Sequence, residues 1–147
     1  MRYKVLAIEV PICEESSGPA LYSADYIYSL LKSDLADLAQ ETFIVLTLDQ
    51  KNHVIDRHVI AIGTLTECLV HPRDVFRHAI LDNAASIAVA HNHPSGDPAP
   101  SSGDKQITDR IAECAKMLGF RLLDHVIIGN GRYYSFAGAG ALCGAEV

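Results

Sequence analysis

The chain has 147 residues, of which 49% are hydrophobic, and this is enough apolar material for a single packed core. Its formal net charge of −6 argues against strong non-specific attraction to nucleic acid, because that attraction depends on Lys and Arg neutralising phosphates. No apolar run is long enough to span a bilayer and the N-terminal segment lacks a signal-peptide cleavage site, so we expect a cytoplasmic protein with no membrane partner.

The first half of the chain carries alternating strand and helix signals. Residues 3–10 alternate as a strand does, and residues 14–19 are rich in turn-forming Ser, Gly and Pro. Apolar residues recur at helical spacing from Ser23, a good N-cap, to about Ser33. The β-branched and apolar runs 42–49 and 54–62, separated by turn residues, predict an antiparallel hairpin.

The second half continues the alternation. A helix is predicted over 72–83, with proline in its first turn, followed by a short central strand over 86–90. A proline-rich loop then leads into a helix over 101–119 that ends at a glycine. The runs 122–128 and 132–136 predict a final hairpin. The predicted fold class is therefore α/β, more exactly α+β, with a mixed central β-sheet flanked by helices.

The segment HNHPSGDPAPSSGD, residues 91–104, is the strongest candidate for chemistry. Residues i and i+2 of a strand project to one face, so His91 and His93 can point at a single ion. Asp104, at the start of the next helix, can fold back across the loop and add an oxygen ligand. Two imidazoles and one carboxylate leave the fourth position of a tetrahedral zinc ion open for water, as catalytic zinc sites require.

Simpler interpretations of the same residues exist. An H-x-H pair alone is a weak signal, because two histidines at a strand end are often ordinary surface residues. The pattern Ser101-x-x-Asp104 also resembles a helix N-cap followed by an acidic residue that the helix dipole favours. The capping role and the ligand role are compatible, since the cap would hold the carboxylate in place.

The complete spacing is more specific than its parts. His-x-His-Pro, six residues, Ser, two residues and Asp resembles the JAMM motif of JAB1/MPN metalloproteases. The string HNHPSGDPAPS, together with LDHVIIG at 123–129, resembles more narrowly the RadC family. The similarity runs from about Ser23 to Phe136. It implies a cytidine-deaminase-like JAB/MPN fold over residues 23–137. We assign the predicted N-terminal strand and turn (1–22) to the same domain, and we expect the glycine-containing tail (138–147) to be flexible.

The resemblance also implies roles for individual residues. In JAMM proteins a glutamate before a core strand accepts a proton from the metal-activated water, and Glu41 matches that position; from the residues alone it would be an exposed residue preceding a strand. Ser101 would hydrogen-bond the oxyanion of the tetrahedral intermediate. His125 stays open between supporting the site from behind, together with Asp124, and forming a structural pair with it.

The leading functional hypothesis is a zinc-dependent hydrolase that cleaves a peptide or isopeptide bond in a peptide or protein substrate. The alternative is a RadC-like binding module associated with DNA repair or mobile elements, in which the metal is only structural. Longer RadC proteins carry a helix-hairpin-helix DNA-binding region, and nothing before Ser23 resembles one, so direct nucleic-acid binding is not expected. A metal-dependent nuclease is a weaker option, because it would normally use more carboxylates.

Overall fold

The computed structural model describes residues 20–63 and 70–142, so the strand and turn predicted for 3–19 lie outside the described residues. Within these ranges the elements follow in the order α1 (Ala24–Leu35), β1 (Thr42–Leu48), β2 (Val54–Ile62), α2 (Pro72–Leu81), β3 (Ser86–Asn92), α3 (Ser102–Leu118), β4 (Arg121–Ile128) and β5 (Tyr133–Ser135). Each corresponds to an element predicted from the sequence, and β3 runs further than its predicted end at position 90.

The strands form one mixed sheet in the order β2-β1-β3-β4-β5. β3 and β4 are parallel, and every other neighbouring pair is antiparallel. The parallel pair arises because α3 carries the chain back between β3 and β4, whereas short turns join β1 to β2 and β4 to β5. The α/β fold with a mixed sheet is confirmed, and so are both predicted hairpins.

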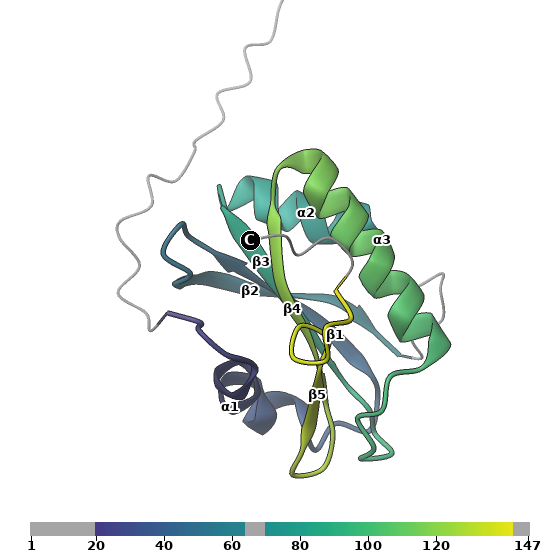
Figure 1. Cartoon of the computed structure of the whole chain (residues 1–147). Helices are drawn as coiled ribbons and strands as arrows, with labels where there is room; N and C mark the ends of the chain where they lie inside the picture. Colours follow the sequence, from purple (N-terminus) through teal and green to yellow (C-terminus); the bar gives the residue numbers. More distant parts are fainter. Residues whose placement is uncertain (1–19, 64–69, 143–147) are drawn as a thin grey trace, which may run out of the picture.

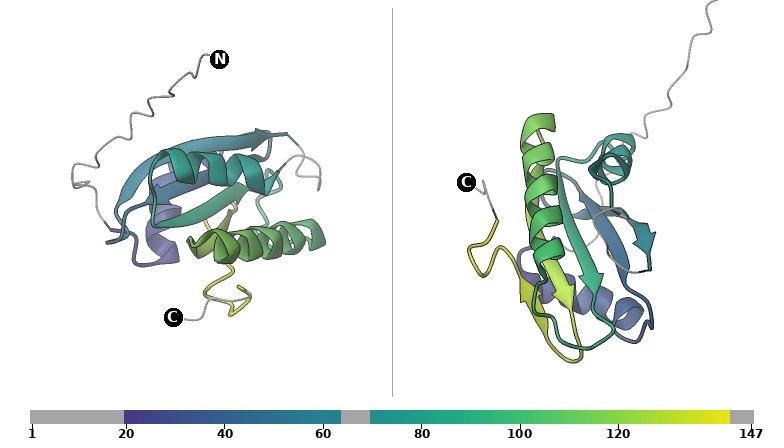
Figure 2. Two further views of the ribbon diagram at one scale, coloured as in Figure 1. Left: turned by 90° about the horizontal axis from the view of Figure 1, so that it is seen from above. Right: turned by 90° about the vertical axis from the view of Figure 1, so that its right-hand side faces the viewer.

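Helices cover both faces of the sheet (Figures 1 and 2). Side chains alternate along the central strands, so Ile44 and Leu46 of β1 pack against α1, whereas Phe43 and Val45 pack against α2 and α3. Every residue of β1 and of β3 is buried. The two apolar clusters that result form one core on each side of the sheet.

The helix boundaries follow the capping signals in the sequence. The Ser23 side chain accepts a hydrogen bond from the N–H of Tyr26 at the start of α1, and Pro72 occupies the first turn of α2. Gly119 ends α3 in the left-handed conformation, with φ of 82°. This conformation has no steric cost for glycine, which explains why the helix stops there.

The chain after β5 stays close to the sheet for several residues. Ala139 donates its backbone N–H to Ser135 O, and Ala141 donates to Phe136 O, so residues 136–140 form hydrogen-bonded turns. The rest of the predicted tail, 143–147, lies outside the described residues. Among the helices that the structure describes, none has the length and apolar character needed to cross a membrane.

Candidate metal centre

Two histidines lie at the end of β3. His91 pairs with Phe43 of β1 and Ile127 of β4, and its side chain is fully buried. His93 follows the strand and donates its backbone N–H to Ile128 O at 2.9 Å. Because the two histidines are two positions apart, their imidazoles share one face, and their Nε2 atoms lie 3.1 Å apart.

Asp104 approaches these imidazoles from the first turn of α3. Its Oδ1 lies 3.1 Å from His91 Nε2, and its Oδ2 lies 3.2 Å from His93 Nε2. A capping box holds the carboxylate: the N–H of Ser101 donates to Asp104 Oδ2, and the N–H of Asp104 donates to Ser101 Oγ. The structure thus brings together the three residues that the sequence selected as ligands, and the cap orients the carboxylate.

A buried chain of hydrogen bonds determines which nitrogen of His91 carries the proton. Thr108 Oγ1 donates to the carbonyl of Asp104 at 2.6 Å, so it accepts from His125 Nδ1, 2.5 Å away. The other nitrogen of His125, Nε2, therefore accepts from Nδ1 of His91 at 2.8 Å. His91 consequently presents an unprotonated Nε2 to the site.

His93 reaches the same state through a different partner. Its Nδ1 lies 2.8 Å from the backbone carbonyl of Asp97, which can only accept, so Nδ1 carries the proton and Nε2 carries a lone pair. The lone pairs of His91 Nε2 and His93 Nε2 therefore face each other beside an anionic carboxylate. Such an arrangement is repulsive unless a cation or a proton lies between the three groups.

The donor set suits zinc. Ligands at zinc–nitrogen and zinc–oxygen distances of about 2.0 to 2.2 Å in a tetrahedron are separated by about 3.3 Å. The two Nε2 atoms lie 3.1 Å apart, and each faces a different oxygen of Asp104: Oδ1 lies 3.1 Å from His91 Nε2, and Oδ2 lies 3.2 Å from His93 Nε2. The residues present therefore fit a tetrahedral divalent cation and leave its fourth position to a molecule from solvent.

The electrostatics of the site favour an anionic Asp104 carboxylate and a neutral His125 imidazole. Burial acts to raise the pKa of Asp104, but the contacts with His91 and His93 outweigh it and hold that pKa well below its usual range. The hydrogen bond with Asp104 raises the pKa of His93. Complete burial lowers the pKa of His125 well below its ordinary value, which keeps that imidazole neutral.

The proline-rich loop between β3 and α3 rests against the turn after β4. Gly96 donates its N–H to His93 O and accepts from the N–H of Asn130, both at 2.9 Å. Gly129 lies against this loop, because a Cβ at position 129 would overlap the Gly96 carbonyl and lie 2.8 Å from Cδ of Pro98. The close approach requires glycine at 129. The proline-rich loop also carries the Asp97 carbonyl, which lies 2.8 Å from His93 Nδ1.

Glu41 is the last residue before β1. The N–H of Gly63 donates to its carbonyl at 2.8 Å, and strand alternation places its side chain on the same face as Phe43 and His91. After the larger effect of Asp104, the Glu41 carboxylate also raises the pKa of His93, as expected for a negative charge on that side of the sheet. Its role as a proton shuttle stays a prediction.

Ser101 is exposed at the start of α3, and its Oγ already accepts from the N–H of Asp104. Its own hydroxyl proton can still point outward to a substrate, so its role as an oxyanion donor also stays a prediction.

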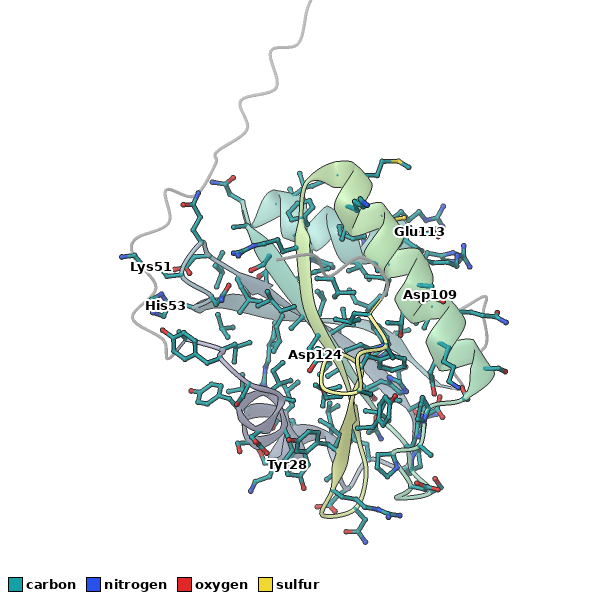
Figure 3. All side chains as sticks on the ribbon, viewed as in Figure 1. Tyr28, Lys51, His53, Asp109, Glu113 and Asp124 are labelled. Carbon is teal, nitrogen blue, oxygen red and sulfur yellow. The ribbon has the colours of Figure 1, made fainter. Side chains whose placement is uncertain are left out.

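Sequence reasoning missed Thr108 and left His125 undecided. Thr108 is a polar residue on the buried stripe of α3, four residues after Asp104, and that position was the available signal. Asp124 contacts the backbone of His125, because its Oδ1 accepts the N–H of His125 at 2.7 Å. Its carboxylate accepts hydrogen bonds from Ser135 Oγ and the N–H of Ala137, next to the turn after β5 (Figure 3).

A second group of side chains has ligand atoms close enough for a cation. Asp56, His58 and Asp82 lie on β2 and at the end of α2. His58 Nε2 is 2.7 Å from Asp82, so one N–H satisfies that contact without a metal. Asp56 is exposed, and His78 stacks on the His58 ring. This group has the features of a surface hydrogen-bond cluster, and it supplies a control for metal binding.

Comparison with known proteins finds a matching family model and several similar relatives. The model of the RadC-like JAB domain family matches residues 21–141. A UPF0758 protein of Methanococcoides burtonii is 45% identical over 88% of this chain and 57% of its own length. A UPF0758 protein of Clostridium perfringens is 51% identical over 74% of this chain and 48% of its own length. The corresponding protein of Rubrobacter xylanophilus is 42% identical over 93% and 60%. The chain therefore matches about half of the length of these relatives.

Proposed function

The chain belongs to the family of RadC-like JAB domains, and we propose that it is a zinc-dependent hydrolase that cleaves a peptide or isopeptide bond in a peptide or protein substrate. The observation that supports this proposal most is the convergence of two unprotonated Nε2 atoms, from His91 and His93, on the Asp104 carboxylate. Two nitrogens and one oxygen form a ligand set that suits zinc.

Each residue of the site has its own role in such a reaction. A bound zinc ion would act as a Lewis acid that lowers the pKa of water to about 7. Glu41 accepts the proton of the attacking water and delivers it to the leaving amine. Ser101, exposed beside Asp104, donates its hydroxyl hydrogen to the developing oxyanion. His91, His93 and Asp104 would hold the ion.

Metal analysis tests the site. Protein purified without chelators should contain about one zinc per chain, because two imidazoles and one carboxylate converge at the end of β3. His91→Ala, His93→Ala and Asp104→Ala should each remove the metal. The matched control, His58→Ala, changes the surface cluster and should retain it. Wild-type protein without stoichiometric metal, or loss of the metal only in the His58 variant, contradicts the proposal.

Turnover tests the chemistry separately. We expect the wild type to cleave members of a panel of fluorogenic peptides and lysine-linked isopeptides. Glu41→Gln should keep its zinc and lose about a hundredfold or more of the rate, as is typical for removal of a general base. Retained zinc with no cleavage of any substrate, together with salt-sensitive binding of DNA, would instead support a binding module with a structural metal.

A further inference from the structure

Asn92 lies between the two histidines in sequence but on the opposite face of β3. Its side chain is 1% exposed. Its Oδ1 accepts the backbone N–H of Thr42 at 2.8 Å, and its Nδ2 donates to the carbonyl of Gln40 at 3.1 Å. A longer contact of 3.5 Å reaches the carbonyl of Leu38. The amide therefore bonds the chain on both sides of Glu41.

These bonds take over where the backbone pairing of β1 with β3 ends. The last paired residues are Phe43 and His91. Beyond them the N–H of His93 donates to Ile128 O of β4, and the register of β1 with β3 does not extend to Thr42. The carboxamide of Asn92 offers one acceptor and one donor in its place.

The other side of Glu41 is held by the residue that follows β2, because the N–H of Gly63 donates to the Glu41 carbonyl. The backbone around Glu41 is thus fixed from both neighbouring strands. A backbone restrained in this way determines the face to which the side chain projects, which is the face of His91. Without Asn92, a buried N–H and a carbonyl would lose their partner, and the segment 38–42 would be free to shift.

We propose that Asn92 is a positioning residue, which holds Glu41 so that its carboxylate faces the metal ligands. The significance of this position for catalysis rests on the proposed function. The positioning itself depends only on the contacts of Asn92 with Gln40 and Thr42. The two claims can therefore be tested apart.

Hydrogen exchange in metal-free protein tests the positioning directly. In Asn92→Ala the Thr42 amide loses its acceptor, and we expect its exchange to accelerate by about tenfold or more. The matched control is Thr47→Val, which removes a buried hydroxyl on the same strand that donates to Asp82 at 2.6 Å. In the control, the exchange rate of the Thr42 amide should change only as much as the loss of global stability predicts. Equal exchange at Thr42 in the wild type and Asn92→Ala overturns the proposal.

A distance measurement tests the side chain. Protein labelled with ¹³C-carboxyl glutamate and loaded with Co²⁺ should show strong paramagnetic broadening of the Glu41 carboxyl signal, assigned with Glu41→Gln. Asn92→Ala should bind Co²⁺ as the wild type does, because Asn92 does not contact His91 Nε2 or Asp104, yet the broadening of Glu41 should fall. Asn92→Asp, which still accepts from Thr42 but opposes an oxygen to the Gln40 carbonyl, should show a smaller fall.

The outcomes separate the two hypotheses. Unchanged broadening in Asn92→Ala overturns the positioning role even if the protein is a hydrolase. Absence of Co²⁺ binding by the wild type rejects the proposed function, and the exchange of Thr42 then still decides the role of Asn92. If peptides are cleaved, Asn92→Ala should lower kcat with little change in KM, and combining it with Glu41→Gln should cause little further loss.

Discussion

Nδ1 of His91 and Nε2 of His125 lie 2.8 Å apart in a fully buried contact between the neighbouring parallel strands β3 and β4. This contact makes His125 the partner that determines the tautomer of a candidate metal ligand. A histidine ligand with such a partner is held in orientation and kept basic. The metal centre therefore extends behind its three ligands into the core.

Replacing His125 by Phe should weaken zinc binding by about 10- to 100-fold, because the ring is kept but Nδ1–H of His91 loses its acceptor. Competition with a chromophoric chelator measures this affinity. His78→Phe is the matched control, since His78 stacks on His58 away from the site. Equal affinities of the His125 variant and the wild type would show that the contact does not support the metal.

Thr108→Val should lower the free energy of unfolding by about 1 to 3 kcal/mol, because it keeps the shape of the side chain and leaves Nδ1–H of His125 without a partner in the core. Urea denaturation of metal-free protein measures the loss. Thr108→Ser restores the hydroxyl and should be clearly more stable than the valine variant. The opposite order would mean that cavity formation, and not hydrogen bonding, dominates at this position.

Gly129→Ala should destabilise the protein by about 1 to 3 kcal/mol, because the new methyl group overlaps the backbone of Gly96 and displaces the loop under His93. Zinc affinity should fall with it. The control is Gly103→Ala in the first turn of α3, where a Cβ meets only Ser101 Oγ at 3.7 Å and should be neutral or slightly stabilising. Thermal unfolding with and without zinc measures both effects.

Asp124 should make the stability of the fold depend on pH. Burial raises its pKa, despite the opposing hydrogen bond from Ser135. The folded protein therefore binds this proton more tightly than the unfolded chain. The contribution of Asp124 is fully present below the unfolded value of about 3.9 and is lost as the pH rises through the folded pKa. The stability of wild type relative to Asp124→Asn should thus decline from about pH 4 upward, in urea titrations at matched ionic strength. A difference that grows with pH would contradict the raised pKa.

Local patterns in the sequence predicted most of the fold and the three ligands. His91 and His93 share a face because of strand alternation, and Asp104 is placed by a capping box that covers only four residues. Each of these relationships joins residues that are close along the chain. Periodicity and caps of the same kind predicted the helices and both hairpins.

The supporting residues depend on relationships between distant segments. The contact of His125 with His91 requires the parallel register that places Val89 opposite His125 and His91 opposite Ile127. The bonds of Asn92 require the start of β1 to lie beside the end of β3. Strand order and register arise from the packing of the whole core. Local sequence patterns therefore do not predict them.

The ligands and their buried support all come from the continuous segment between β3 and β4, residues 86–128, whereas the carboxylate assigned to proton transfer comes from the start of β1. In the proposed function, ion retention and bond cleavage are therefore assigned to separate pieces of the chain. A related domain in which Glu41 is replaced would lose hydrolytic activity and would still bind the ion between β3 and α3. Metal content alone therefore does not distinguish an active family member from an inactive one that has only a structural role.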